Sequence, residues 1–236
     1  MPRVAPSLSF VPDEPFRFVG GHVAADLVNT VNWEARGLER DRLSDFGRVV
    51  AWAAAAGVVA ERAARRLRAA AAARPADARR AYEAARWLRD VLRRLFGAVA
   101  AGTLGGLDGR RALAEFNELL RDATRDLTLA AADRRAANPV EAPLVWRWEP
   151  ADELTGALHP VAWEAARLLA SPDAARVRVC AGVDCGWVYV DQSRNGLRRW
   201  CEMQTCGTLE KSRRRAGRSA DAAAARAPAA RRRGGA

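Results

Sequence analysis

The chain has 236 residues, half of them hydrophobic, which is enough for one medium-sized domain and a small module. Its formal net charge of +11 is placed unevenly, because the stretch from Arg176 to Ala236 holds 14 of the 39 Lys and Arg but 5 of the 28 Asp and Glu. This asymmetry predicts a polyanionic partner, either nucleic acid or an anionic membrane surface, and the alternative is a solvated basic tail.

The N-terminus and the apolar stretches argue against a membrane protein. The opening MPRVAPSLSFVPDEP lacks the apolar run of a secretory signal, and residues 49–60 are too short and too rich in alanine to span a bilayer. We therefore expect no membrane partner and a cytoplasmic protein, whose thiols stay reduced rather than forming disulfides.

Residues 1–15 are expected to be an extended N-terminal lead, and residues 16–173 a mostly helical domain. Phe16 and Phe18 alternate before Gly20-Gly21, which predicts a short strand and a tight turn, followed by a helix through Val31. Ser44 is the expected N-cap of the next helix, which should stop at Gly57.

Helical periodicity dominates the rest of this domain. Helices are predicted over residues 59–73, 79–102, 112–123 and 154–171, with a glycine-rich break before the third, and short strands over 127–129 and 143–150. The predicted fold class is mainly α with a few short β strands (α+β), followed by a small C-terminal zinc module over residues 176–218. Residues 219–236 are expected to form a disordered basic tail.

All four cysteines lie in one short stretch with the spacing C-x4-C-x15-C-x4-C. Two pairs of thiolates can close a tetrahedral site around one structural Zn²⁺, and metal binding would then supply the folding energy of the module, on the order of 10 kcal/mol. An iron–sulfur cluster and redox-active thiols are the alternatives. Four thiolates leave no open position, which argues against a catalytic zinc. The predicted ligands are Cys180, Cys185, Cys201 and Cys206.

Basic residues stand on both sides of the predicted ligands, and zinc would hold them in a shaped surface. Guanidinium groups bind phosphates in a bidentate manner and can read guanine edges, and an asparagine can read adenine. DNA is therefore the predicted partner, with the run Arg213 to Arg215 on a short helix that leaves the module. The candidate DNA-binding residues are Arg194, Asn195, Arg198, Arg199, Lys211, Arg213, Arg214 and Arg215.

A second candidate site lies near the start of the helical domain. His22, Asn29, Thr30 and Trp33 could line a pocket for a small-molecule or protein effector. A capping role for His22 and a buried hydrogen-bond network are the alternatives, and His159 at a helix start is expected to be structural. No nucleophile–base pair or carboxylate pair stands out, so we expect no enzyme.

The cysteine segment "CAGVDCGWVYVDQSRNGLRRWCEMQTCG" strongly resembles the CGNR-type zinc finger of bacteria. The matching positions are Cys180, Cys185, Trp187, Asp191, Ser193, Arg194, Asn195, Arg198, Arg199, Trp200, Cys201, Met203, Cys206 and Gly207. The blocks "FRFVGGHVAADLVNTVNW", "DRLSDFGRVVAWA", "LRRLFGAVAAG" and "LAEFNELLRDA" are similar to those of the ABATE domain that accompanies this finger.

The resemblance implies a stress-induced transcription regulator whose zinc ribbon binds DNA, in the cytoplasm and associated with the nucleoid. Its N-terminal domain would sense a signal or a partner. The chain departs from the family at Thr208 and Leu209, where the pattern has Asn and Arg. Any DNA contacts that those two side chains make in relatives are therefore lost here. The alternative function for the whole chain is a zinc-stabilised protein-interaction module without sequence-specific DNA binding.

Overall fold

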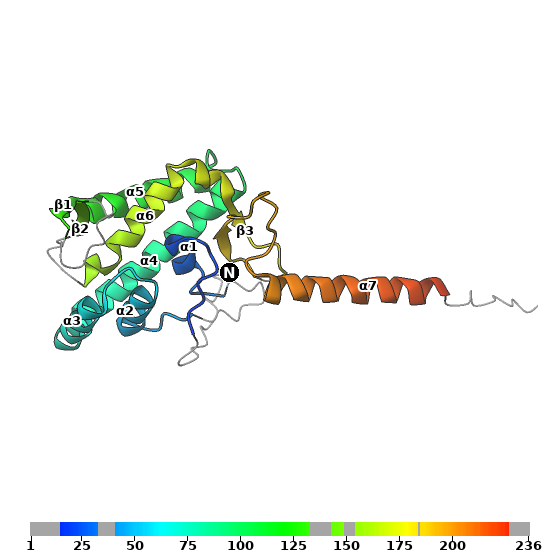
Figure 1. Ribbon diagram of the computed structural model, residues 1–236, viewed down its shortest axis with the longest axis horizontal. Coiled ribbons are helices and arrows are strands. Elements are labelled where there is room, and N and C mark those ends of the chain that lie inside the picture. Colours follow the sequence, from blue (N-terminus) through cyan, green and yellow to red (C-terminus); the bar gives the residue numbers. More distant parts are fainter. Residues whose placement is uncertain (1–14, 33–40, 133–142, 149–153, 184, 227–236) are drawn as a thin grey trace, which may run out of the picture.

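A computed structural model describes residues 15–32, 41–132, 143–148, 154–183 and 185–226 of the chain. The long helix α4 (Pro75–Ala100) runs through the middle of a helical body, and the shorter helices pack around it (Figure 1). These are α1 (Val23–Val28), α2 (Phe46–Ala55), α3 (Glu61–Ala73), α5 (Leu107–Arg125), the 3₁₀ turn η1 (Thr155–Leu158) and α6 (His159–Leu169).

Two small antiparallel sheets complete the body. Strands β1 (Leu127–Ala131) and β2 (Leu144–Trp148) pair in the register Leu129 with Trp146, beside the end of α5. After the 3₁₀ turn η2 (Pro172–Arg176), strands β3 (Val177–Val179) and β4 (Val188–Val190) pair in the register Arg178 with Tyr189. The π-helical turn η3 (Met203–Gly207) then leads into α7 (Thr208–Arg226), which projects away from the body (Figure 1).

The predicted fold class, mainly α with a few short strands, is confirmed, but several boundaries differ. Residues 16–18 form no strand, and α1 ends at Val28. The N-cap of α2 is Asp45 rather than Ser44, because the Asp45 carboxylate accepts the backbone N–H of Arg48 at 2.9 Å. Helix α2 ends at Ala55, two residues before the expected stop.

Three helices are longer than predicted, and one of them, α5, begins at Leu107 rather than at residue 112. Pro75 at the first position of α4 is compatible with helix because its missing N–H would have no partner there. Helix α7 extends to Arg226 and so includes residues 219–226 of the predicted basic tail, where alanine favours helix. The lead over residues 1–14 and the tail over 227–236 lie outside the described residues.

The core is built on the apolar stripe of α4. Leu92, Leu95 and Phe96 are fully buried, and they share one continuous hydrophobic cluster with Trp52 of α2. That cluster also includes Val177, Val188 and Val190 of the C-terminal sheet. The C-terminal sheet therefore packs into the core of the helical domain, while a second, smaller cluster surrounds the cysteines: Cys180, Trp187, Tyr189 and Cys201.

A buried ion pair ties α4 to the segment before α2. Arg89 donates to both carboxylate oxygens of Asp41, at 2.7 and 2.8 Å, and the two side chains are 2% and 6% exposed. Arg89 also donates to the Thr30 hydroxyl at 3.2 Å, and Asp41 accepts the backbone N–H of Leu43 at 2.9 Å. Each buried charge therefore has both an opposite charge and further hydrogen bonds.

Replacing Arg89 with Leu should destabilise the protein by about 3–5 kcal/mol, because the buried Asp41 carboxylate would lose both short hydrogen bonds from Arg89 and keep as counter-charge only Arg86, whose Nε lies 4.0 Å from its Oδ2. Urea unfolding of the single variant measures this loss. The double variant Asp41→Leu/Arg89→Leu should recover part of it, since it leaves no unpaired charge. A single variant as stable as the original chain would contradict this account of the pair.

Within the described ranges, no helix has the length and apolar character needed to cross a bilayer.

Candidate metal centre

The four cysteine thiols converge between strand β3 and turn η3, and their sulfur atoms all lie within 4.8 Å of one another. The Sγ atom of Cys201 is 3.6 Å from that of Cys185 and 3.7 Å from that of Cys206. A tetrahedron with Zn–S bonds of about 2.3 Å requires sulfur separations of roughly 3.8 Å. The geometry therefore fits one structural zinc ion held by four thiolates.

Backbone N–H groups surround one of these sulfurs. The Cys180 Sγ accepts the N–H of Cys201 at 3.2 Å and that of Gly182 at 3.4 Å. Hydrogen bonds from the Cys185 and Cys201 thiols, together with these N–H groups, hold the pKa of Cys180 well below its usual range. The same hydrogen bonds raise the pKa of Cys185 and Cys201, so binding of a zinc ion, which requires thiolates, would release the protons that these thiols hold.

The loop between the first two cysteines needs glycine at its centre. A Cβ atom at Gly182 would lie 3.0 Å from both the Cβ and the Sγ of Cys206, closer than side chains normally approach. The absence of that atom lets the first cysteine pair come close to the second. Beyond this loop, the Cys180 N–H donates to the carbonyl of Trp187 at 2.7 Å and continues the pairing of β3 with β4.

Asp191 organises the loop that follows β4. It is fully buried, and its carboxylate accepts the N–H and the hydroxyl of Ser193 at 2.9 and 2.6 Å and the N–H of Arg198 at 3.0 Å. Burial opposes ionisation, but these hydrogen bonds outweigh it and lower the pKa of Asp191. The turn therefore presents Arg194 and Asn195 to solvent on a fixed scaffold.

Arg198 points into the module. Its guanidinium lies 4.3 Å from the ring centre of Tyr189 and donates to the carbonyls of Val19 at 2.8 Å and Trp200 at 2.9 Å, and also to that of Cys201. Arg199 is exposed, and its guanidinium lies 5.4 Å from the ring centre of Trp200. Of these two neighbouring arginines, Arg199 is therefore the one available to a partner.

The N-terminal segment before α1 crosses the zinc module. The Gly20 carbonyl accepts the N–H of Val190 and the Gly21 carbonyl accepts the Gln192 side chain, both at 2.8 Å. Gly21 has φ +69°, and a Cβ there would lie 3.1 Å from the Val190 carbonyl oxygen, so glycine suits this contact for both reasons. Arg17 forms an ion pair with Glu202 beyond the strands.

Asn29 joins helix α1 to strand β4. Its side-chain amide donates to the Val188 carbonyl at 2.8 Å, and its oxygen accepts the Val188 N–H at 2.9 Å. The Trp187 indole donates to the Val31 carbonyl at 2.9 Å. These bonds link positions about 160 residues apart in the chain and fix the zinc module on the helical body.

Asp26 is buried at the same junction. Burial raises the pKa of this carboxyl to about 6, although the N–H groups of Gly20 and Val19 and the charge of Arg198 act in the opposite direction. The Gly20 N–H lies 2.8 Å from its Oδ1 atom. The carboxylate therefore serves to hold the N-terminal segment on the module.

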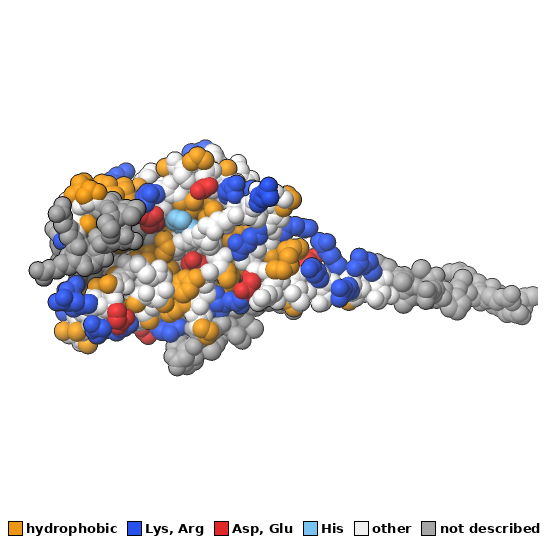
Figure 2. Space-filling model, viewed as in Figure 1, with side chains coloured by type: hydrophobic (Ala, Val, Ile, Leu, Met, Phe, Trp, Pro, Cys, Tyr) orange, Lys and Arg blue, Asp and Glu red, His pale blue; other side chains and the backbone are white. Residues whose placement is uncertain are grey.

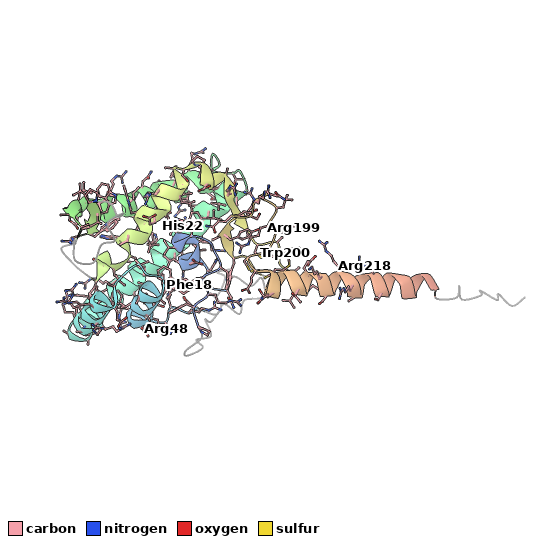
Figure 3. All side chains as sticks on the ribbon, in the orientation of Figure 1. Phe18, His22, Arg48, Arg199, Trp200 and Arg218 are labelled. Carbon is pink, nitrogen blue, oxygen red and sulfur yellow. The ribbon has the colours of Figure 1, made fainter. Side chains whose placement is uncertain are left out.

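The other basic residues lie on α7. Figure 2 shows Lys and Arg side chains gathered along the part of this helix nearest the body, and Figure 3 labels Arg199 on the module and Arg218 on the helix. At about 100° per residue, one face carries positions i, i+3, i+4 and i+7. The exposed residues of this basic stripe are Lys211, Arg214, Arg215 and Arg218.

The side chains predicted to line an effector pocket have structural roles where the structure describes them. His22 is the N-cap of α1, as its alternative interpretation had it, and its Nδ1 accepts the Ala24 N–H at 3.2 Å. Asn29 and Thr30 use their polar atoms inside the protein, and Trp33 lies outside the described residues. A cavity opens elsewhere, beside His159, Asp122 and Asp126, which the sequence did not single out as ligands.

Two family models match the chain. The CGNR zinc finger matches residues 176–219, and the ABATE model, described as "Putative stress-induced transcription regulator", matches residues 21–172, more than half of the chain. No curated protein matches it. The two matches meet within η2, which leads from α6 into the C-terminal sheet that packs on the helical core.

Proposed function

Because the chain belongs to the ABATE family and carries a CGNR zinc finger, we propose that it is a transcription regulator that binds DNA through this finger and α7. The helical domain would sense a signal or a partner, and the protein would act in the cytoplasm at the nucleoid. The observation that carries the proposal is the basic stripe on a helix that projects from a zinc-pinned module.

The dimensions and charges of α7 suit a DNA groove. The major groove is about 12 Å wide and admits an α-helix. The stripe gives such a helix one cationic face, and Arg214 is partly neutralised because it donates to Glu210 at 3.1 Å. Arg194, Asn195 and Arg199 lie exposed on the finger loop and would add contacts to the same duplex. The stripe supplies phosphate affinity, and the ordered loop supplies sequence preference.

Two arginines are left out of the proposed contact face. The Arg198 guanidinium donates hydrogen bonds to the backbone carbonyls of Val19, Trp200 and Cys201, so we assign it a role in positioning the loop. Arg213 lies roughly 160° around α7 from the centre of the stripe, by the helical repeat. Leu209 lies near Arg213 on that opposite face, so restoring Arg at position 209 should change affinity little.

A selection of bound duplexes from random DNA, using the zinc-loaded chain, is the first test. The preferred duplex then serves to compare Arg215→Ala, on the stripe, with Arg213→Ala, on the other face. Both remove one exposed positive charge from the same helix. We expect Arg215→Ala to weaken binding to all duplexes alike and to reduce the magnitude of the salt slope by about 1, and Arg213→Ala to weaken binding much less. Equal losses would contradict the proposed face.

A protein-interaction module is the second candidate. Apolar side chains stand exposed around the zinc centre: Leu197 is 75%, Leu209 60% and Met203 52% exposed. An acidic protein with an apolar contact area would suit this surface. The selection separates the candidates, since a protein-interaction module would enrich no DNA sequence.

A further inference from the structure

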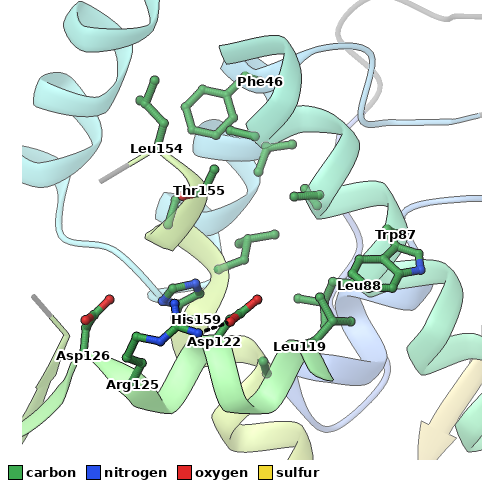
Figure 4. Close-up of a pocket in the computed structure, with 17 residues that line it drawn as sticks. Phe46, Trp87, Leu88, Leu119, Asp122, Arg125, Asp126, Leu154, Thr155 and His159 are labelled. Atoms are coloured by element: carbon green, nitrogen blue, oxygen red, sulfur yellow. Dashed lines mark hydrogen bonds and ion pairs between the residues drawn. The ribbon is translucent and has the colours of Figure 1, made fainter. Parts of the chain in front are cut away.

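The helical domain contains a cavity of about 450 Å³, within the size range of small-molecule sites. It lies between α2, α4, α5 and the η1–α6 segment, away from the cysteines (Figure 4). Its floor is apolar, because Phe46, Leu88 and Leu158 are buried parts of the main core. Ala84 and Ala85 of α4 line the cavity, and their side chains are too small to fill it.

The charged side chains and the histidine that line this cavity lie at one end of it. Figure 4 shows Asp122, Arg125, Asp126 and His159 together, with Phe46 and Leu154 at the opposite end. Arg125 donates to Asp122 at 2.8 Å, so these two charges offset each other. Within the part of the chain that the structure describes, the Asp126 carboxylate accepts no hydrogen bond and forms no ion pair, although its backbone N–H donates to the Thr124 carbonyl.

His159 does not supply the missing positive charge. Burial lowers its pKa, although the Asp126 and Asp122 carboxylates act in the opposite direction. The lowered pKa favours the neutral imidazole, so among the described residues at this end the charges of Asp122, Arg125 and Asp126 sum to a net negative charge. This sign is opposite to that of the whole chain, whose formal charge is +11.

We propose that this cavity binds a small organic cation, an amine with an aromatic or branched apolar body. The body would bury its surface against the floor, and the ammonium group would pair with Asp126 and donate to the carboxylates at the polar end. An anionic ligand would face two carboxylates and a guanidinium that is already paired. If the helical domain senses a signal, as proposed above, this ligand class would be that signal. Binding of the cation to the cavity can be tested whether or not the chain binds DNA.

Three probes that differ in one group test the charge preference: 4-phenylbutylamine, 4-phenylbutan-1-ol and 4-phenylbutyrate. Each is titrated by calorimetry into the full zinc-loaded chain at pH 7. The amine should bind about tenfold or more tightly than the alcohol, as expected for a hydrogen bond between charged groups, and the acid should bind least. No binding of any probe, equal binding of amine and alcohol, or tighter binding of the acid would each overturn the proposal.

Variants then locate the site. Asp126→Asn should remove the advantage of the amine over the alcohol while leaving alcohol binding unchanged. Glu118→Gln is the matched control, since it removes a carboxylate from an exposed position of the same helix outside the cavity, and it should leave both affinities intact. Ala84→Trp should abolish binding of both probes by filling the space. If that variant does not fold, the Asp126 and Glu118 variants still decide the location, and retention of the amine preference in Asp126→Asn would place the probe elsewhere.

Discussion

Replacing Cys206 with Ala is expected to abolish zinc binding and to destabilise the whole chain, not the finger alone. The sulfurs lie 3.6 to 3.7 Å apart across the pairs that involve Cys201, so removing one ligand opens the tetrahedron. Zinc contributes on the order of 10 kcal/mol to the folding of small four-ligand modules. The valines of β3 and β4 belong to the main core, so a loosened finger exposes core surface elsewhere as well.

The measurement combines metal content with thermal unfolding. The original chain should carry about one zinc per molecule, and Cys206→Ala should carry far less. A loss of about 5 kcal/mol would lower Tm by roughly 10–20 °C in a chain of this size. Val183→Ser changes an exposed residue of the loop between Cys180 and Cys185 and should leave zinc and Tm unchanged. Bound iron, or a Cys206→Ala chain that keeps its zinc, would contradict this account.

Ending the chain after Asp173 is expected to abolish cooperative unfolding of the helical domain. The truncation removes Val177, Val188 and Val190, which are at most 5% exposed and pack in the core. Burying each valine contributes about 1.5–3 kcal/mol, and three of them approach the total stability of many domains. It also removes the Val188 backbone groups that satisfy the buried Asn29 amide.

Near-ultraviolet circular dichroism and binding of a hydrophobic dye report this loss. The truncated chain should keep helical far-ultraviolet signal but lose fixed aromatic packing and bind the dye. A chain ending after Arg218 is the control, since it keeps both strands and all four cysteines, and it should unfold cooperatively. Cooperative unfolding of the shorter chain at an unchanged Tm would mean that the helical domain is self-sufficient.

The parts of this structure that the sequence predicts are those governed by local rules. The spacing of Cys180, Cys185, Cys201 and Cys206 predicts the metal centre because ligand pairs close in sequence must close on one ion. The apolar residues of α4 recur with the period of an α-helix, and this period predicts a helix there. Charge composition likewise places the basic surface at the C-terminal end.

The relation between the two family modules depends on contacts far apart in the chain. Nothing in the sequence around Asn29 indicates its partner, because only the folded chain brings the Val188 backbone to its side chain. Arg198 lies beside other basic residues, a pattern that indicates an exposed side chain. The tertiary structure instead places its guanidinium against Tyr189 and the Val19 carbonyl. Such inward positions carry no periodic pattern that a single sequence could reveal.

The sequence does not predict the cavity beside His159, for a related reason. Its walls come from four separate elements, and its polar end joins Asp122 and Asp126 of one helix terminus to a histidine at the start of another. A carboxylate at a helix end usually indicates a solvated side chain. Small residues on α4, such as Ala84 and Ala85, leave the space, but alanine in an alanine-rich sequence does not stand out.

The salt dependence of DNA binding tests the central claim most directly. The affinity of the zinc-loaded chain for its selected duplex is titrated over a series of salt concentrations, beside the variant Lys211→Ala/Arg215→Ala/Arg218→Ala. With about six phosphates contacted, the slope of log K against log salt should be roughly −5, and loss of three contacts should reduce its magnitude by about 3. Equal slopes for the two proteins, or binding that does not change with salt, would contradict a DNA interface on the basic stripe.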